Sequence, residues 1–120
     1  MTTKEVAEKL VGFCRQGDFE SAYRDLYSPE IESIEPEGSP TPYAKGMDEI
    51  MKKSQQFAEM VEEMFGNEVS DPLVADNHFC CSMVMDVQFK GMGRIKMGEL
   101  CVYEVKEGKI VKEQFFYEPE

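Results

Sequence analysis

The sequence predicts one α+β domain in which three helices lie on a bent antiparallel sheet. Two observations indicate this class. Residues 3–65 contain three stretches with apolar residues at helical spacing, separated by one short strand, and residues 68–118 contain four strand-like stretches. Helices gathered in this way pack on one face of an antiparallel sheet. A chain of 120 residues has room for a single domain, residues 1–120, and buries a core without disulfide bridges.

The composition is that of an ordinary globular protein, with 42% hydrophobic and 31% charged residues. No apolar run is long enough to span a bilayer, and the N-terminus lacks the apolar segment of a signal peptide. The net charge of −11 repels phosphate backbones and anionic membrane surfaces. We therefore expect a soluble cytoplasmic protein that binds neither nucleic acid nor membranes.

The first helix is expected over Thr3–Gln16, and a second helix begins after Asp18, a residue type that caps helix N-termini. Gly17 between them fits the left-handed conformation that follows many helices. Pro29 is expected to end the second helix, and a short strand follows over Glu30–Pro36.

The next segment, EGSPTPYAKG, is rich in Gly and Pro and predicts a loop. A third helix is expected from about Met47 to Phe65, where its apolar residues keep helical intervals. After this helix, apolar and polar residues alternate. The alternation predicts strands near Glu68–Val74, His78–Phe89, Arg94–Lys106 and Lys109–Glu118.

The last two strands join through Glu107-Gly108, a pair that suits a type I′ hairpin turn. A turn of this kind fixes the register of both strands. The predicted register pairs Val105 with Ile110, Tyr103 with Lys112, Cys101 with Gln114 and Glu99 with Phe116.

The long strand His78–Phe89 carries apolar residues on both faces, which predicts that both faces are covered. The helices would cover one face. Large exposed apolar patches usually mark interfaces, so we expect a second copy of the chain on the other face, as a homodimer.

The four cysteines are Cys14, Cys80, Cys81 and Cys101, and the single histidine is His78. Their spacing matches no zinc motif, so we expect buried, reduced thiols and no bound metal. No nucleotide-binding motif is present, and we expect no cofactor.

Three segments together resemble the SnoaL-like polyketide cyclases and ketosteroid isomerases of the nuclear transport factor 2-like superfamily. They are FCRQGDFESAYRDLYSPEIESIEP, SPTPYAKGMDEI and CVYEVKEGKIVKEQFFYE, which cover nearly the whole chain in the family's order. The resemblance implies a cone-shaped fold with an apolar pocket between the sheet and the helices. It also implies dimers through the sheet and a range of functions, from isomerases and cyclases to members that only bind or assemble.

The resemblance makes Glu35 the candidate catalytic base. The ketosteroid isomerases place an Asp before a Pro at the end of the first strand, and Glu35-Pro36 occupies the matching position. A carboxylate at the mouth of an apolar pocket can move a proton between carbon atoms. The plainer alternative is a solvated Glu in an acidic stretch that also contains Glu32 and Glu37.

The isomerase groups that stabilise an enolate are replaced here, by Leu10 in the first helix and by Cys101 in the hairpin. Leu has no hydrogen-bond donor and a thiol is a weak one, which argues against the known isomerase route. Five polar or aromatic residues of the predicted hairpin are candidate ligand contacts: Glu99, Cys101, Tyr103, Gln114 and Phe116. Glu99 has the alternative of lying in water near the sheet edge.

These observations predict a domain that binds a small apolar molecule in its pocket. Its reaction would be a cofactor-free isomerisation, cyclisation or dehydration of a cyclic or polyketide-like substrate. A non-catalytic ligand-binding or assembly module of the same fold is the alternative, and an acidic surface for a protein partner is a third. The groups inside the pocket distinguish them, because an enzyme needs a buried ionisable group beside a hydrogen-bond donor.

Overall fold

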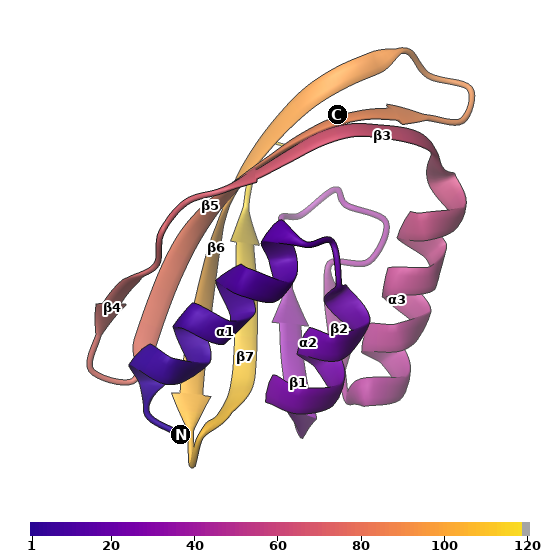
Figure 1. The fold of residues 1–120 in the computed structure, drawn as a ribbon. Helices are drawn as coiled ribbons and strands as arrows, with labels where there is room; N and C mark the ends of the chain where they lie inside the picture. Colours follow the sequence, from indigo (N-terminus) through magenta and orange to yellow (C-terminus); the bar gives the residue numbers. More distant parts are fainter. Residues whose placement is uncertain (119–120) are drawn as a thin grey trace.

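A computed structural model describes residues 1–118, so the last two positions of the expected domain lie outside the described residues. Three helices, α1, α2 and α3, span Thr3–Arg15, Phe19–Leu26 and Met47–Met60. The strands β1 to β7 span Tyr27–Ile34, Tyr43–Lys45, Val61–Val69, Leu73–Ala75, His78–Phe89, Arg94–Lys106 and Lys109–Phe116. The predicted α+β class is confirmed: the three helices lie against one curved, open sheet (Figure 1).

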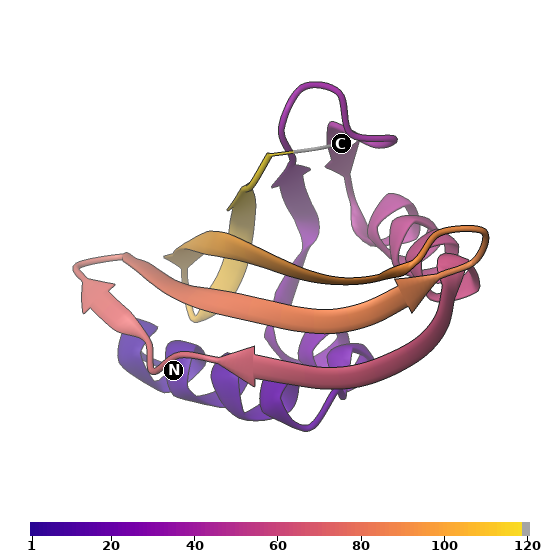
Figure 2. The same ribbon diagram turned by 90° about the horizontal axis from the view of Figure 1, so that it is seen from above.

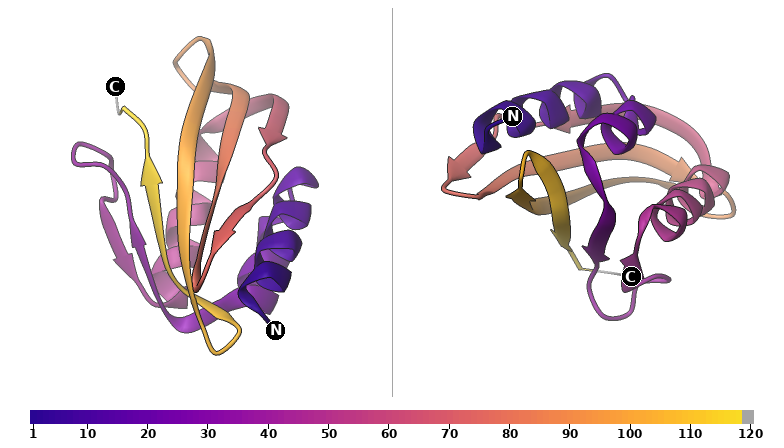
Figure 3. Two further views of the ribbon diagram at one scale, coloured as in Figure 1. Left: turned by 90° about the vertical axis from the view of Figure 1, so that its left-hand side faces the viewer. Right: turned by 90° about the horizontal axis from the view of Figure 1, so that it is seen from below.

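The sheet has the strand order β2-β1-β7-β6-β5-β3, and β4 also pairs with β5. Every neighbouring pair is antiparallel except β1 and β7, which are parallel, so the sheet is mixed where a purely antiparallel one was predicted. The sheet bends around the helices (Figure 2, Figure 3). We call the face that contacts the helices the inner face and the opposite one the outer face.

The core fills the space between the helices and the inner face. Its largest fully buried side chains come from α1, α2, α3 and four strands: Leu10, Leu26, Ile50, Ile31, Phe79, Val87, Cys101 and Ile110. None of the helices within residues 1–118 has the length and apolar character needed to cross a bilayer.

Local signals at the N-terminus are confirmed. Thr2 and Glu5 form a reciprocal capping box at the start of α1. Gly17 has a φ of 72°, which glycine adopts without strain, and the Asp18 side chain caps α2. The helix ends at Leu26, three residues before Pro29, and β1 therefore begins earlier than predicted.

The predicted third helix is too long by about one turn. It ends at Met60, and Val61–Val69 continue as β3, antiparallel to β5 with Val61 opposite Phe89. Apolar residues at helical intervals suggested a longer helix, but pairing with the long β5 satisfies the backbone of this segment instead. Pro72, which has no N–H to donate to a ladder, separates β3 from β4. The predicted single strand Glu68–Val74 is therefore wrong.

The predicted loop contains a strand. Tyr43–Lys45 form β2, which pairs with the second half of β1 at the sheet edge. Gly46, with a φ of 85°, then turns the chain into α3.

The hairpin between β6 and β7 starts as predicted and then changes register. Glu107 and Gly108 both have positive φ, as a type I′ turn requires, and Val105 faces Ile110. Glu104 then faces Lys112, so Val111 is an extra residue on β7, a β-bulge. Beyond it the predicted pairs are wrong by one residue, and each later side chain of β7 lies on the opposite face.

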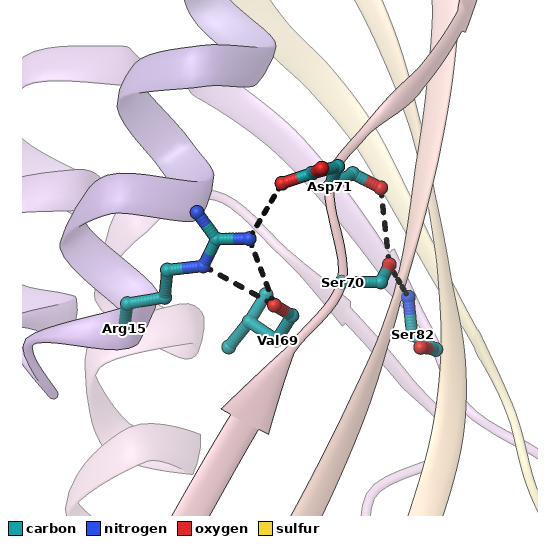
Figure 4. A network of polar contacts seen from close by, with 5 residues as sticks. All are labelled: Arg15, Val69, Ser70, Asp71 and Ser82. Atoms are coloured by element: carbon teal, nitrogen blue, oxygen red, sulfur yellow. Dashed lines mark hydrogen bonds and ion pairs between the residues drawn. The ribbon is translucent and has the colours of Figure 1, made fainter.

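Arg15, at the end of α1, ties this helix to the segment after β3 (Figure 4). Its guanidinium donates to the carbonyl of Val69 at 3.0 and 3.2 Å and to the carboxylate of Asp71 at 2.8 Å. Next to it, the hydroxyl of Ser70 accepts from the N–H of Ser82 on β5 at 2.9 Å. These contacts hold α1 across the inner face.

The core predicts a contrast between two leucines. Leu26 is 0% exposed and Leu73 is 73% exposed. Leu26→Ala should lower the free energy of unfolding by roughly 2–5 kcal/mol, because it leaves a cavity, whereas Leu73→Ala should change it by less than about 0.5 kcal/mol. Urea denaturation followed by circular dichroism measures both, and equal effects would contradict the placement of α2 in the core.

Candidate functional site

A cluster of polar side chains occupies the inner face where β1 and β7 end beside α3. At its centre is Lys53 of α3, whose Nζ lies 2.5 Å from Glu35 Oε2 and 2.9 Å from Ser33 Oγ. The side chains of Lys53 and Glu35 are only 20% and 16% exposed. Glu35 is therefore not a solvated residue at a strand end, and the structure places it on the inner face, as a pocket residue would be.

Both oxygens of the Glu35 carboxylate are occupied. Oε2 pairs with Lys53, and Oε1 accepts a hydrogen bond of 2.6 Å from the hydroxyl of Tyr117. Burial and the neighbouring Glu35 raise the pKa of Tyr117, which keeps its hydroxyl a donor. Lys53 also lies over the ring of Phe115, 5.0 Å from its centroid. For Glu35 to take a proton from a ligand, one of these contacts must first be exchanged.

A second carboxyl, Glu113 of β7, lies deeper in the same cluster and is almost fully buried. It accepts a hydrogen bond from the hydroxyl of Tyr27 at the start of β1. Burial raises the pKa of Glu113, while Tyr27, Lys53 and Ser33 act in the opposite direction. The hydroxyl of Ser33 accepts a hydrogen bond from Lys53, and its hydrogen bond to Glu113 favours the ionised form of that carboxyl. A chain of polar contacts therefore runs from the core to the Lys53–Glu35 ion pair.

The third carboxyl is Glu99 of β6, which is partly buried on the inner face. Its Oε1 lies 3.7 Å from the sulfur of Cys101, a weak donor. The pKa of Glu99 is raised from 4.5 to about 7, mainly by burial and to a smaller extent by the negative charge of Glu35. Cys101 and Lys53 moderate the rise. A carboxyl that titrates near neutral pH has the proton affinity that a general base needs.

Two of the expected ligand contacts are core residues. Cys101 is fully buried, and Tyr103 is buried with its ring stacked on Phe79 at a centroid distance of 4.7 Å. Tyr103 therefore packs the interior beneath the cluster.

The other two expected contacts, Gln114 and Phe116, point the other way. Because of the bulge at Val111, Gln114 lies opposite Val102 and Phe116 opposite Leu100, on the outer face. The prediction that they share a face with Glu99 is wrong. Both still border a shallow groove of about 400 Å³ around the end of β7, which Glu35, Pro36, Phe115, Tyr117 and Glu118 also line.

Four residues of the cluster were missed by the sequence reasoning: Ser33, Lys53, Glu113 and Tyr117. Lys53 carried a signal, because it lies between Ile50 and Phe57 at helical spacing and so on the apolar stripe of α3. The sequence did not predict that Glu113 and Tyr117 lie on the inner face, because this depends on the register shift in β7. Among residues 1–118, no group of three or more His, Cys, Asp or Glu side chains is arranged to bind a metal ion.

Comparison with protein families gives one match over nearly the whole chain: a model of the SnoaL-like domain matches residues 1–117. A comparison with curated proteins gives no match.

Solved structures with the same fold are numerous. A candidate SnoaL-like polyketide cyclase from Mesorhizobium loti, also described as a carbohydrate phosphatase, shares 33% sequence identity at a TM-score of 0.91, covering 98% of this chain and all of that one. A nuclear transport factor 2-like protein of unknown function from Burkholderia pseudomallei shares 14% identity, with a TM-score of 0.81 over 98% of this chain and 92% of that one. TerC, crystallised with polyporic acid, shares 12%, with a TM-score of 0.79 over 97% and 91%.

The environment of Glu99 predicts how stability depends on pH. Because its pKa in the folded protein, about 7, lies above the ordinary value of 4.5, ionisation of Glu99 opposes folding. The stability it contributes is present below pH 4.5 and lost as the pH rises through 7. Glu99→Gln should therefore reduce the loss in free energy of unfolding between pH 4.5 and 8, measured by urea denaturation.

Glu8→Gln, at an exposed position of α1, is the matched control and should leave that pH dependence unchanged. A carbon-13 NMR titration of Glu99 measures its pKa directly. A midpoint at 4.5 or below would show that Glu99 is hydrated.

Proposed function

Because the chain belongs to the SnoaL-like family, we propose that it binds a small apolar cyclic or polyketide-like molecule at the polar cluster of the inner face and changes it by cofactor-free proton transfer. The reaction class is isomerisation, cyclisation or dehydration. The observation that supports this most is a carboxyl with a pKa of about 7, Glu99, in the same cluster as two donors, Lys53 and Tyr117, that interact with it electrostatically.

In this proposal Glu99 takes a proton from a carbon next to a carbonyl group of the substrate. The enolate oxygen that forms needs a hydrogen-bond donor or a positive charge. Lys53 and Tyr117 supply both, once the substrate oxygen replaces one oxygen of Glu35 as their acceptor. Glu35 then acts as the residue that holds the two donors in place between turnovers.

Glu35 is also a candidate for the base, as the resemblance to the ketosteroid isomerases implies. Its two occupied oxygens favour Glu99 for that role. The two assignments differ in the substitution that removes the reaction, which is Glu99→Gln if Glu99 is the base and Glu35→Gln if Glu35 is. Glu99 as the base also gives a rate that rises through a midpoint near pH 7.

The charge of the cluster favours a neutral substrate. Three carboxyls, Glu35, Glu99 and Glu113, surround the single ammonium of Lys53. A phosphate ester or a carboxylate placed there would meet like charges in a region of low dielectric constant. The apolar ligand expected from the aromatic residues of β7 meets no such repulsion.

The alternative is a module that binds such a ligand without changing it. In that case the Glu35–Lys53–Tyr117 contacts are structural and need not open.

We further propose a cytoplasmic location, with which four free cysteines are compatible.

The proposal predicts deuterium exchange at the α-carbon of 2-tetralone, a neutral bicyclic ketone, in heavy water. Proton NMR should show exchange above the buffer rate, with a rate that rises through a midpoint near pH 7. Glu99→Gln should lower the enzymatic rate by about 100-fold or more, which is the usual contribution of a general base.

Glu104→Gln is the matched control, because it changes the same residue type on the same strand but on the outer face, and it should keep the rate. Loss of exchange in Glu35→Gln, with full exchange in Glu99→Gln, would assign the base to Glu35. Saturable binding of 2-tetralone without exchange would instead support the binding module.

We also propose the homodimer through the outer face. Leu100 and Phe116 lie opposite each other there and are 44% and 49% exposed, which leaves an apolar surface on adjacent strands.

If this dimer forms, Leu100→Glu should convert it to a monomer, because burying a charge without a partner is costly. Met51→Glu, at a position on α3 that is 42% exposed, should leave the dimer intact. Multi-angle light scattering at micromolar concentration measures both masses. A wild-type protein with the mass of one chain would contradict the dimer.

A further inference from the structure

Two cysteines face each other across adjacent strands of the inner face. Cys81 of β5 and Cys101 of β6 are direct register partners, and both side chains are buried. The N–H of Val105 donates to the carbonyl of Asn77 at 2.8 Å, which makes that pair a hydrogen-bonded one. Hydrogen-bonded and non-hydrogen-bonded pairs alternate, and Cys81–Cys101 is four pairs further along, so it is of the same kind.

The Cα spacing of such a pair lies within the range found for disulfide bonds. The Cα atoms of a hydrogen-bonded antiparallel pair lie about 5.5 Å apart. Disulfide-bonded cysteines have Cα distances of about 4.4–6.8 Å, with most near 5.5–6 Å. The Cβ atoms of such a pair lie about 5.5 Å apart, however, and a relaxed disulfide needs about 3.5–4.5 Å. The two strands must therefore approach locally when the bond forms, and the bond is strained and easily reduced.

The two thiols already interact. The Cys101 S–H donates to Glu99 in the reduced protein, and when Cys81 ionises it can donate to the Cys81 thiolate instead, which lowers the pKa of Cys81 and raises the pKa of Cys101. Cys81 is thus the sulfur with more thiolate character, which is the form that reacts with oxidants.

The remaining cysteines differ from this pair. The side chain of Cys80 lies on the outer face, where its register partner is Val102. Cys14 is on α1, and burial raises the pKa of its thiol to about 12, which makes it unreactive.

We propose that Cys81 and Cys101 are a redox-active pair that forms a reversible intramolecular disulfide bond when the protein is exposed to a peroxide. In the first step the Cys81 thiolate attacks one oxygen of hydrogen peroxide and the O–O bond breaks. The sulfenic acid forms, and the departing hydroxide takes up the proton that the thiol released and becomes water. The Cys101 sulfur then attacks the Cys81 sulfur, the S–O bond breaks and a second water leaves. Two thiols and one peroxide thus give one disulfide and two waters, and an added dithiol restores the thiols.

This bond would act on the candidate site directly. The sulfur of Cys101 lies 3.7 Å from Glu99 Oε1, and the hydrogen bond between them lowers the pKa of Glu99. Oxidation removes the thiol hydrogen and therefore this contact. The pair stands independently of the proposed reaction, because it rests on strand register and thiol chemistry alone.

The test treats the reduced protein with hydrogen peroxide, unfolds it in a denaturant so that buried thiols become accessible, blocks free thiols with N-ethylmaleimide and measures the intact mass with and without prior reduction. The expected product is a single chain, not linked covalently to a second one, that has lost two hydrogens and carries blocking groups on two cysteines, Cys14 and Cys80, instead of four. Prior reduction with dithiothreitol should restore all four.

The variants identify the partners. Cys80→Ser should still form the bond, and because it leaves Cys81 as the single cysteine of its tryptic peptide, mass spectrometry can assign the link to Cys101 without ambiguity. Cys14→Ser should also form it. Cys81→Ala and Cys101→Ala should each abolish it, and peptide mapping of the Cys80→Ser protein gives the same answer if either alanine variant fails to fold.

Three outcomes would overturn the proposal. They are four blocked cysteines after peroxide treatment, a bond that includes Cys80 or Cys14, and conversion of Cys81 or Cys101 to a sulfinic or sulfonic acid without a bond between them.

Discussion

The ion pair between Lys53 and Glu35 is the interaction on which the inner face depends. Three carboxyls converge on this region, from β6, from β7 and from the residue after β1, and Lys53 is the cation that faces them from α3. Removing one partner of a largely buried pair leaves an uncompensated charge, at a cost of about 3–5 kcal/mol. The same contact attaches α3, whose fully buried side chain is Ile50, to the end of β1. One lysine therefore serves both the fold and the chemistry of the cluster.

The three carboxyls have the same chemistry and different environments. Glu35 is fixed by two donors, Glu113 is enclosed with Tyr27, and Glu99 has one weak donor and partial access to solvent. Burial raises the pKa of both Glu99 and Glu113, but Glu113 lies in the core, where a ligand cannot reach it. A general base works best when a ligand can reach it and its pKa lies near the working pH, and the proposed role of Glu99 rests on these two conditions.

Much of the fold could be predicted from the sequence, because it depends on interactions between residues that are close together in the chain. Caps such as Thr2 and Asp18, the glycine at position 17 and the Glu107-Gly108 turn are decided by backbone chemistry within a few residues. The end of α3 was missed because the apolar spacing continues past Met60, while pairing with β5 is a non-local interaction that local spacing does not reveal. The site was predicted less well for the same reason. A single extra residue, Val111, exchanged the faces of β7, so that Gln114 and Phe116 were expected where Glu113, Phe115 and Tyr117 are found.

The reversed faces of β7 also show which donors stand in this chain in place of the isomerase donors. At the positions where the resemblance expects a Tyr and an Asp, this chain has Leu10 and Cys101, both in the core. Two other donors, Lys53 of α3 and Tyr117 just after β7, contact the Glu35 carboxylate. Stabilising an enolate requires a donor at the place where charge develops, and it does not require that the donor come from a particular helix or strand. In the proposed reaction, the donors that support the enolate would therefore come from α3 and the end of β7 instead of from α1 and β6.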